Sequence, residues 1–121
     1  GVSFLFAGWD KNHQFQLYQS DPSGNYGGWK AKAIGANDLA ASMLLKDDYK
    51  DDLSIKDAQQ LALKVLSKTM DTATPSVDKI EFSTITKVGN NIQWHVLTKD
   101  ELAQVLKDGE EMLKKQAEQD E

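Results

Sequence analysis

The chain opens with three segments in which apolar and polar side chains alternate, a pattern typical of β-strands. These segments cover residues 2–8, 14–20 and 29–34, with "WDKNH" as the first connection and a glycine-rich stretch as the second. In the second connection Pro22 fixes its own φ and Gly24 is free to take a positive φ, which suits a tight reversal. The pattern therefore predicts three consecutive strands.

Helical spacing of apolar residues follows these strands. Asn37 or Asp38 is placed to cap a first helix that runs to about Tyr49. Its predicted apolar side carries Leu39, Ala40, Met43 and Leu44. A second helix begins at the capping-box-like sequence Ser-Ile-Lys-Asp from Ser54 and ends near Met70. Its predicted core stripe is Ala58, Leu61, Ala62, Val65, Leu66 and Met70.

Alternation returns after Pro75, which ends the helical section. Residues 80–85 and 92–96 are predicted strands joined by a hairpin turn at Gly89-Asn90. The capping box Thr98-Lys-Asp-Glu opens a third helix, and the tail from about residue 114 to 121 is expected to be frayed or disordered. The order of three strands, two helices, two strands and one helix predicts an α+β fold with antiparallel connections.

If the five strands form one sheet, both of its faces are apolar. One face is expected to carry Phe4, Phe6, Leu17, Ile92 and Trp94 or their neighbours, whichever register applies, and the other Leu5, Tyr18, Ile34, Ile85 and Leu97. Two helices lying side by side cover only one of them. Leaving five or six large apolar side chains bare forfeits about 10 kcal/mol, which rivals the roughly 5–15 kcal/mol that stabilises a typical domain. A further part of the chain or another molecule is therefore expected to cover the second face.

Composition narrows the classes of function. The 121 residues fit one domain, and 40% hydrophobic with 27% charged residues is typical of a globular protein. No apolar run approaches the roughly 18–20 residues of a membrane-spanning helix. The absence of cysteine excludes disulfides, thiolate catalysis and cysteine-ligated zinc. A net charge of −5, with all 14 basic residues being lysine, argues against nucleic-acid binding and leaves no bidentate guanidinium.

Three motifs resemble ligand sites but favour plain structural roles. "GNYGG" lacks the Lys-Ser/Thr that completes a phosphate-binding loop, so it is interpreted as a strand connection that needs positive φ. "KDDYKDD" lacks the spacing, central glycine and closing glutamate of a calcium loop, so it is interpreted as a solvated turn between helices. His13 and His95 lie far apart in the sequence, and no further zinc ligands suggest themselves. We predict no metal and no cofactor.

Four stretches carry a resemblance to a known family. "GVSFLFAGWD", "FQLYQSDPSGNYGGWKAKAIGAN", "DYKDD" and "LALKVLSKTMD" closely resemble the second half of eukaryotic proteasome α-type subunits. The likeness extends to about residue 98 and weakens in the last helix and tail. The resemblance implies that residues 1–121 are the C-terminal portion of an α-subunit domain and that the start at Gly1 is a truncation.

The same resemblance implies an N-terminal nucleophile hydrolase fold, a sandwich of two sheets between two layers of helices. The five strands and three helices of this chain are expected to form one antiparallel five-stranded sheet with its helices. The first half of the chain would supply the other sheet and its helices. This would provide the cover that the two-faced apolar pattern demands.

The resemblance also bears on catalysis. Catalytic relatives attack with an N-terminal threonine, whereas Gly1 has no side chain. Ala36 stands at about the position of their supporting serine, and Asp71 aligns with their supporting aspartate, which does no chemistry without its partners. No catalytic residue is therefore predicted.

The resulting hypothesis is a structural, non-catalytic α-ring subunit of the proteasome core particle, found in cytoplasm and nucleus. Its expected partners are neighbouring α subunits, the β ring and a regulatory ATPase complex, while nucleic acid and membrane are not expected. The isolated chain is expected to self-associate. Two alternatives remain open: an active amidohydrolase of the same fold with its nucleophile in the missing half, and a stand-alone adaptor that binds protein through a bare sheet face.

Overall fold

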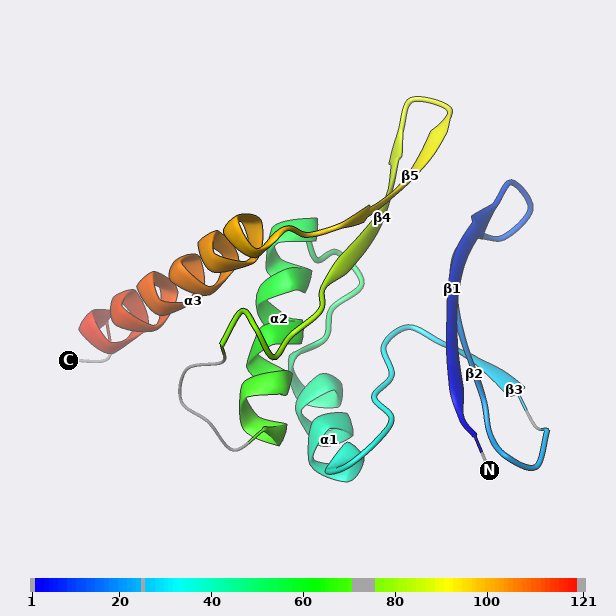
Figure 1. Ribbon diagram of the computed structural model, residues 1–121, viewed down its shortest axis with the longest axis horizontal. Helices are drawn as coiled ribbons and strands as arrows, with labels where there is room; N and C mark the ends of the chain where they lie inside the picture. The colour runs from blue at the N-terminus through cyan, green and yellow to red at the C-terminus, as the bar shows by residue number, and fades with distance from the viewer. Residues whose placement is uncertain (1, 25, 71–75, 120–121) are drawn as a thin grey trace.

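The protein is described here from a computed structural model, which places residues 2–24, 26–70 and 76–119. The expectations that concern Gly1, Asp71 and Pro75 lie outside these described residues. Eight elements follow one another, as Figure 1 shows. They are β1 (Phe4–Asp10), β2 (Gln14–Ser20), β3 (Tyr26–Trp29), α1 (Asp38–Asp48), α2 (Ile55–Thr69), β4 (Ser83–Val88), β5 (Asn91–Val96) and α3 (Lys99–Gln119). The order confirms the predicted α+β class with antiparallel connections.

Strands β1, β2 and β3 form one antiparallel sheet in that order. The β1–β2 turn is held by Asp10, whose Oδ1 accepts hydrogen bonds from the backbone N–H groups of Asn12 (2.9 Å) and His13 (2.7 Å). The β2–β3 turn is held by Asp21, whose carbonyl accepts a 3.1 Å hydrogen bond from the N–H of Gly24, a residue at φ +92°. The prediction of a tight reversal at Gly24 is thus confirmed.

The third strand differs from the prediction. It occupies Tyr26–Trp29, so it shares only Trp29 with the predicted strand; residues 26–28 were expected in the loop, and residues 30–34 are outside any strand. Register explains the difference, because Leu17 pairs with Trp29 and Ser20 pairs with Tyr26. Because the turn after β2 is short, the next residues of the chain lie directly opposite the end of β2 and pair with it. This pairing, rather than the apolar–polar alternation of residues 29–34, decides where the third strand lies.

Strands β4 and β5 form a separate hairpin, closed at Gly89-Asn90 as predicted, with Gly89 at φ +61°. The single five-stranded sheet is not what the structure shows, since the strands divide into a three-stranded and a two-stranded sheet. The base of the hairpin belongs to the helical side of the molecule. Leu97 donates a 2.9 Å backbone hydrogen bond to Phe82, and Ile80, predicted to lie in the strand, is instead buried in the helical core.

Helix starts follow the predicted capping signals closely. Ser54 Oγ accepts the N–H of Asp57 (3.1 Å) at the start of α2. At the start of α3, Thr98 Oγ1 accepts the N–H of Glu101 (3.2 Å) and Glu101 Oε1 accepts the N–H of Thr98 (3.0 Å), a complete capping box. Asn37 precedes α1 but makes no side-chain cap, because its Nδ2 donates to the carbonyl of Thr69 at the end of α2 (2.9 Å).

The helical core is small and partly displaced from the predicted stripes. Its centre is Leu63, Ile80 and Leu102, with Leu66, Val77, Phe82, Val105 and Leu106 packed around it. Leu63 was absent from the predicted stripe of α2, whose Ala58 is exposed. On α1 the buried residue is Ala41, while Leu39 and Met43 are 79% and 69% exposed, so the predicted apolar side was wrong there. Helix α2 packs against both α1 and α3, which a single stripe does not describe.

Helix α3 continues to Gln119, past the point where a tail was expected. Residues 111–119 are all exposed, so fraying of this end stays a prediction. Among the described residues, no helix is long and apolar enough to cross a lipid bilayer.

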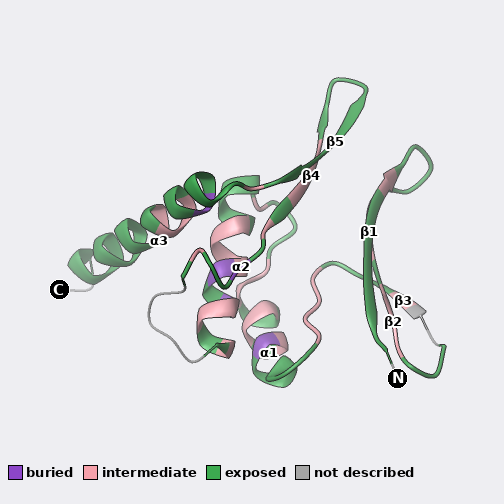
Figure 2. Cartoon of the chain, viewed as in Figure 1, coloured by how far each residue is buried: buried purple, intermediate pink, exposed green. Residues whose placement is uncertain are grey.

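The accessible surface is large for the size of the chain. It measures 9257 Å², whereas a compact folded monomer of 13.5 kDa exposes about 6,500 Å². The excess is roughly 2,700 Å². Figure 2 shows where it lies: the described residues of both sheets are exposed or half-buried, and the buried positions lie on the three helices and, for Ile80, in the segment before β4.

Candidate functional site: apolar sheet faces

One side of the β1–β3 sheet is apolar except for Gln19, which pairs with Leu5. Cross-strand partners share a face, and the register pairs Ala7 with Leu17, Trp9 with Phe15, and Leu17 with Trp29. With Leu5, these residues define what we call the apolar face of the β1–β3 sheet: Leu5, Ala7, Trp9, Phe15, Leu17 and Trp29. Four of them, Leu5, Ala7, Phe15 and Trp29, are exposed, and the other two are half-buried.

The opposite side of this sheet mixes aromatic and polar residues. The register places Phe6 beside Tyr18, and the rings of Phe4 and Phe6 lie 5.7 Å apart, centroid to centroid. Gln14, Gln16 and Ser20 share this side. It is also exposed, with Phe6 55% accessible. The sequence left the register of β1 against β2 open, and the structure places Leu17 on the face of Leu5 and Tyr18 on the face of Phe6.

Gly28 pairs with Tyr18 across the sheet. A Cβ at this position would lie 3.5 Å from the Tyr18 ring, an ordinary van der Waals contact, so the packing here does not require glycine. Position 24 does require a residue that tolerates positive φ, because Gly24 lies in the turn at φ +92°. The interpretation of "GNYGG" as a strand connection therefore holds at Gly24, whereas Tyr26, Gly27 and Gly28 belong to strand β3 itself.

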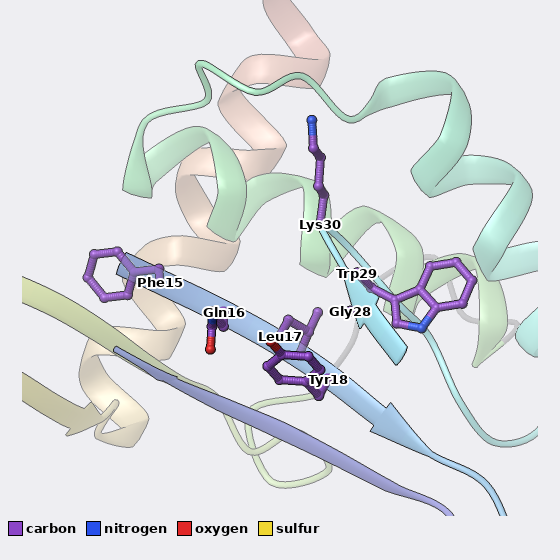
Figure 3. A pocket seen from close by; sticks show the side chains of 7 residues that line it. All are labelled: Phe15, Gln16, Leu17, Tyr18, Gly28, Trp29 and Lys30. Carbon is purple, nitrogen blue, oxygen red and sulfur yellow. The ribbon is translucent and has the colours of Figure 1, made fainter. Parts of the chain in front are cut away.

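The hollows on this sheet do not enclose a reaction site. Figure 3 shows the residues that line a hollow of about 250 Å³: Phe15, Gln16, Leu17, Tyr18, Gly28, Trp29 and Lys30. Successive residues of a strand point to opposite faces, so these side chains do not converge on one enclosed space. Lys30 extends away from the others and pairs with Asp51, Nζ to Oδ1, at 3.0 Å.

The β4–β5 hairpin also has one apolar and one polar face. Ile85 pairs with Trp94, Lys87 with Ile92 and Ser83 with Val96. We call Ile85, Ile92, Trp94 and Val96 the apolar face of the hairpin. Trp94 is 70% exposed and Val96 50% exposed, so this face is also uncovered. The other face carries Thr84, Thr86, Gln93 and His95.

A cation–π contact joins the two sheets. Lys87, which shares the apolar face of the hairpin, places Nζ 4.9 Å from the centroid of the Trp9 ring on the apolar face of the β1–β3 sheet. Trp9 Nε1 is buried and has no hydrogen-bond partner among the residues that the structure describes. A buried indole N–H normally finds an acceptor, so this donor is unusual.

Ion pairs join the connections to the helical side. The mutual hydrogen bond and attraction of Lys30 and Asp51 raise the pKa of Lys30 and lower that of Asp51. Burial raises the pKa of Tyr49, with the nearby Asp51 charge adding to the shift. Lys64 pairs with Asp48 at 2.6 Å. "KDDYKDD" thus supplies Asp48 and Asp51 to ion pairs with lysines, in keeping with a structural turn.

The other sequence candidates are dispersed. Ala36 lies exposed in the turn before α1 and presents only a methyl group. His13 Nδ1 lies 3.6 Å from Asp10 Oδ1, and His95 Nε2 lies 2.9 Å from Glu101 Oε2, so each histidine has its own carboxylate. Among residues 2–24, 26–70 and 76–119, no three His, Cys, Asp or Glu side chains are grouped to hold a metal ion. The candidate site is therefore sought on the exposed apolar faces of the two sheets, where the sequence predicted that a further part of the chain or another molecule would cover one face.

Comparison with known proteins decides the family. The family model described as "Proteasome subunit" matches residues 1–85, more than two thirds of the chain. The chain belongs to the proteasome subunit family. It is 54% identical over 109 residues to proteasome subunit alpha type-4 of Dictyostelium discoideum, covering 89% of this chain and 44% of that protein. It is also 54% identical over 107 residues to the alpha type-4-A subunit of Arabidopsis thaliana, covering 88% and 43%.

A third proteasome relative sharpens the likeness in the first part of the chain. The alpha type-4 subunit of Spinacia oleracea is 66% identical over 85 residues, covering 70% of this chain and 34% of that protein. These relatives are all alpha type-4 subunits, in agreement with the α-type resemblance seen in the sequence. The chain spans less than half the length of the curated relatives it matches.

Proposed function

We propose that this chain is the C-terminal part of a structural, non-catalytic α-type subunit of the proteasome core particle. The observation that carries the proposal is the pair of uncovered apolar sheet faces in a chain 54–66% identical to alpha type-4 subunits. Such faces are surfaces for packing rather than for chemistry. In this role the domain contributes shape: it packs beside neighbouring α subunits, stacks on the β ring and helps form the surface where a regulatory ATPase complex docks.

The fold proposed for the whole subunit is the two-sheet sandwich of N-terminal nucleophile hydrolases. Two features favour strands of this chain in both sheets, rather than all five in one. The β1–β3 sheet and the hairpin each have an apolar face, and Lys87 reaches from one of these faces to Trp9 on the other. The remaining length of the relatives would then complete both sheets. It would also cover the outer face of the β1–β3 sheet, which carries Phe4, Phe6 and Tyr18. The excess of roughly 2,700 Å² of surface is consistent with a cover of this size.

A non-catalytic role is supported by the side chains at hand. Ala36 offers no hydroxyl, and the histidines are engaged with Asp10 and Glu101. The proposed location is cytoplasm and nucleus, where core particles would assemble. Without its cover, the 121-residue chain is proposed to self-associate through the apolar faces.

The proposal is tested in cells that make the full-length subunit with an affinity tag. Gel filtration should place the tagged chain with a large particle that hydrolyses fluorogenic peptides. Trp94→Asp, which puts a charge on the apolar face of the hairpin, should shift the tagged chain out of that particle. The matched variant Gln93→Asp changes the polar face of the same strand and should leave assembly intact.

Catalysis is tested on the same material. An active-site label that reacts covalently with nucleophilic hydrolases should mark other chains of the particle and leave the tagged chain unlabelled. Labelling of the tagged chain would favour the amidohydrolase alternative. A tagged chain that elutes alone, folded and with no other subunit, would favour the adaptor.

A further inference from the structure

Helix α3 leaves the rest of the molecule halfway along its length. Its 21 residues extend about 30 Å. The first half packs on α2 through Leu102, Val105 and Leu106. From residue 110 to residue 119 every side chain is exposed, and Figure 2 shows this half as a uniformly exposed rod directed away from both sheets.

The apolar stripe of α3 does not stop where its packing stops. Leu102, Val105, Leu106 and Gly109 recur at helical spacing, and Met112 and Leu113 continue the series. Met112 is 42% exposed and Leu113 is 68% exposed. The outer half of α3 therefore presents an apolar pair with nothing packed on it among the described residues.

Negative charges flank this apolar pair on its N-terminal side, and an equal number of positive charges flank it on its C-terminal side. The sequence reads Glu110-Glu111-Met112-Leu113-Lys114-Lys115, so two acids precede the apolar pair and two lysines follow it. In the described part of the chain none of these four charged side chains forms an ion pair. The charges of this segment are therefore complementary to those of a second, identical helix that runs antiparallel to it.

We propose that the outer half of α3 binds the same segment of a second copy of this chain, as an antiparallel pair centred on Met112 and Leu113. Around a two-fold axis at this point, the apolar pairs of the two copies pack together. Helical geometry then places Glu110 beside Lys114 of the second copy and Glu111 beside Lys115, each contact occurring twice. Charge complementarity thus selects a second copy over an unrelated helix.

The contact is small, because about two turns of each helix take part. Its area falls in the range of weak and transient interfaces. The contact lies on the helical side of the molecule, away from both sheets (Figure 1). It is therefore compatible with a longer protein in which the sheet faces are covered. The inference does not depend on the proposed function.

The same charges also fit a simpler account, which the experiment must separate. Glu110 and Lys114, like Glu111 and Lys115, stand four residues apart and favour the helix by themselves. That account predicts no dependence on a second copy. The dimer account predicts that a chain carrying four lysines around the apolar pair prefers a partner carrying four acids.

The first experiment uses the absence of cysteine in the chain. Met112→Cys places one thiol near the proposed two-fold axis, and Lys107→Cys places one on the opposite side of α3. Under mild oxidation Met112→Cys should form disulfide-linked dimers at least tenfold faster than Lys107→Cys at equal concentration. Equal rates would overturn the proposal, because association through the sheets does not bring residue 112 of two copies together.

The second experiment keeps Met112→Cys and reverses charges. Glu110→Lys with Glu111→Lys, and separately Lys114→Glu with Lys115→Glu, should each slow cross-linking about tenfold at low salt, because like charges then face each other. An equimolar mixture of the two variants should restore the rate and yield mainly the mixed dimer, identified by mass. Circular dichroism checks that each variant remains helical. Unchanged rates in the single variants, or a mixture without preference for the mixed dimer, would overturn the proposal.

Discussion

Lys87 and Trp9 lie 78 positions apart in the sequence, yet Lys87 Nζ stands 4.9 Å from the centroid of the Trp9 ring. The contact joins the β4–β5 hairpin to the β1–β3 sheet, which share no backbone ladder among the described residues. It puts a cation at the junction of two apolar faces, where the ring attracts it and its aliphatic stem covers apolar surface.

The first prediction concerns this contact. Lys87→Met keeps the stem and removes the charge, so it should lose the attraction to the ring. A double-mutant cycle with Trp9→Leu in urea unfolding should give a coupling of about 0.5–1 kcal/mol. Lys79→Met, at an exposed position outside the hairpin, should show no coupling to Trp9→Leu. A zero coupling for Lys87 would mean that the two sheets are not held together by this pair.

The unpartnered Trp9 Nε1 gives the second prediction. Trp9→Phe removes a buried donor that has no acceptor, so it should change the free energy of unfolding of the 121-residue chain by less than about 1 kcal/mol. In the full-length subunit, where a covering element supplies an acceptor, the same substitution should cost roughly 1–2 kcal/mol more. Comparison of the two unfolding curves measures the difference. An equal effect in both chains would mean that no acceptor reaches Trp9 in the longer protein.

Features fixed by neighbouring residues were predictable from sequence. The caps at Ser54 and Thr98 and the turn at Gly89 depend on a few consecutive residues, and the structure has them where the sequence analysis placed them. Family membership was likewise predictable, because the stretch around residues 18–35 is distinctive in itself.

Features fixed by distant partners were not predictable in the same way. Whether Leu17 or Tyr18 shares a face with Phe6 depends on the register of β1 against β2, and a slip of one residue reverses it. Leu39 and Met43 have the spacing of a buried stripe, yet α1 packs through Ala41. The contact between Lys87 and Trp9 depends on how the two sheets are placed relative to each other, and no local sequence pattern predicts that placement.

The third prediction tests the cap of α2. Ser54→Ala leaves the N–H of Asp57 without its acceptor and should reduce the free energy of unfolding by about 1 kcal/mol. Ser54→Asp retains an acceptor next to the positive end of the helix dipole and should stay within about 0.5 kcal/mol of the original chain. Urea unfolding of the three chains provides the comparison. Equal losses in both variants would assign the effect to the hydroxyl itself rather than to capping.

The fourth prediction concerns the close approach of α2 and α3. A Cβ at Gly109 would lie 2.6 Å from Gln60 Oε1, and Gln60 Nε2 donates a 2.8 Å hydrogen bond to the carbonyl of Val105. Gly109→Ala should gain about 1 kcal/mol of helix propensity but lose a similar amount by displacing the Gln60 amide. In a Gln60→Ala background only the gain should remain. A double-mutant cycle measures this difference, and equal effects in both backgrounds would contradict it.

The last prediction follows from Glu101, which joins the capping box of α3 to His95. Its pKa is held below the ordinary value of 4.5, first by the hydrogen bond from the backbone of Thr98 and then by the contact with His95. A carboxyl group whose pKa falls on folding stabilises the native state above its ordinary pKa, and this contribution is lost as the pH drops through the folded-state value. The original chain should therefore be more stable than Glu101→Gln at pH 6, and the two should converge toward pH 3. Because the capping-box geometry is available to glutamine, the comparison isolates the charge. Glu111→Gln, an exposed change farther along α3, should show no such convergence, and parallel curves for Glu101→Gln would contradict the lowered pKa.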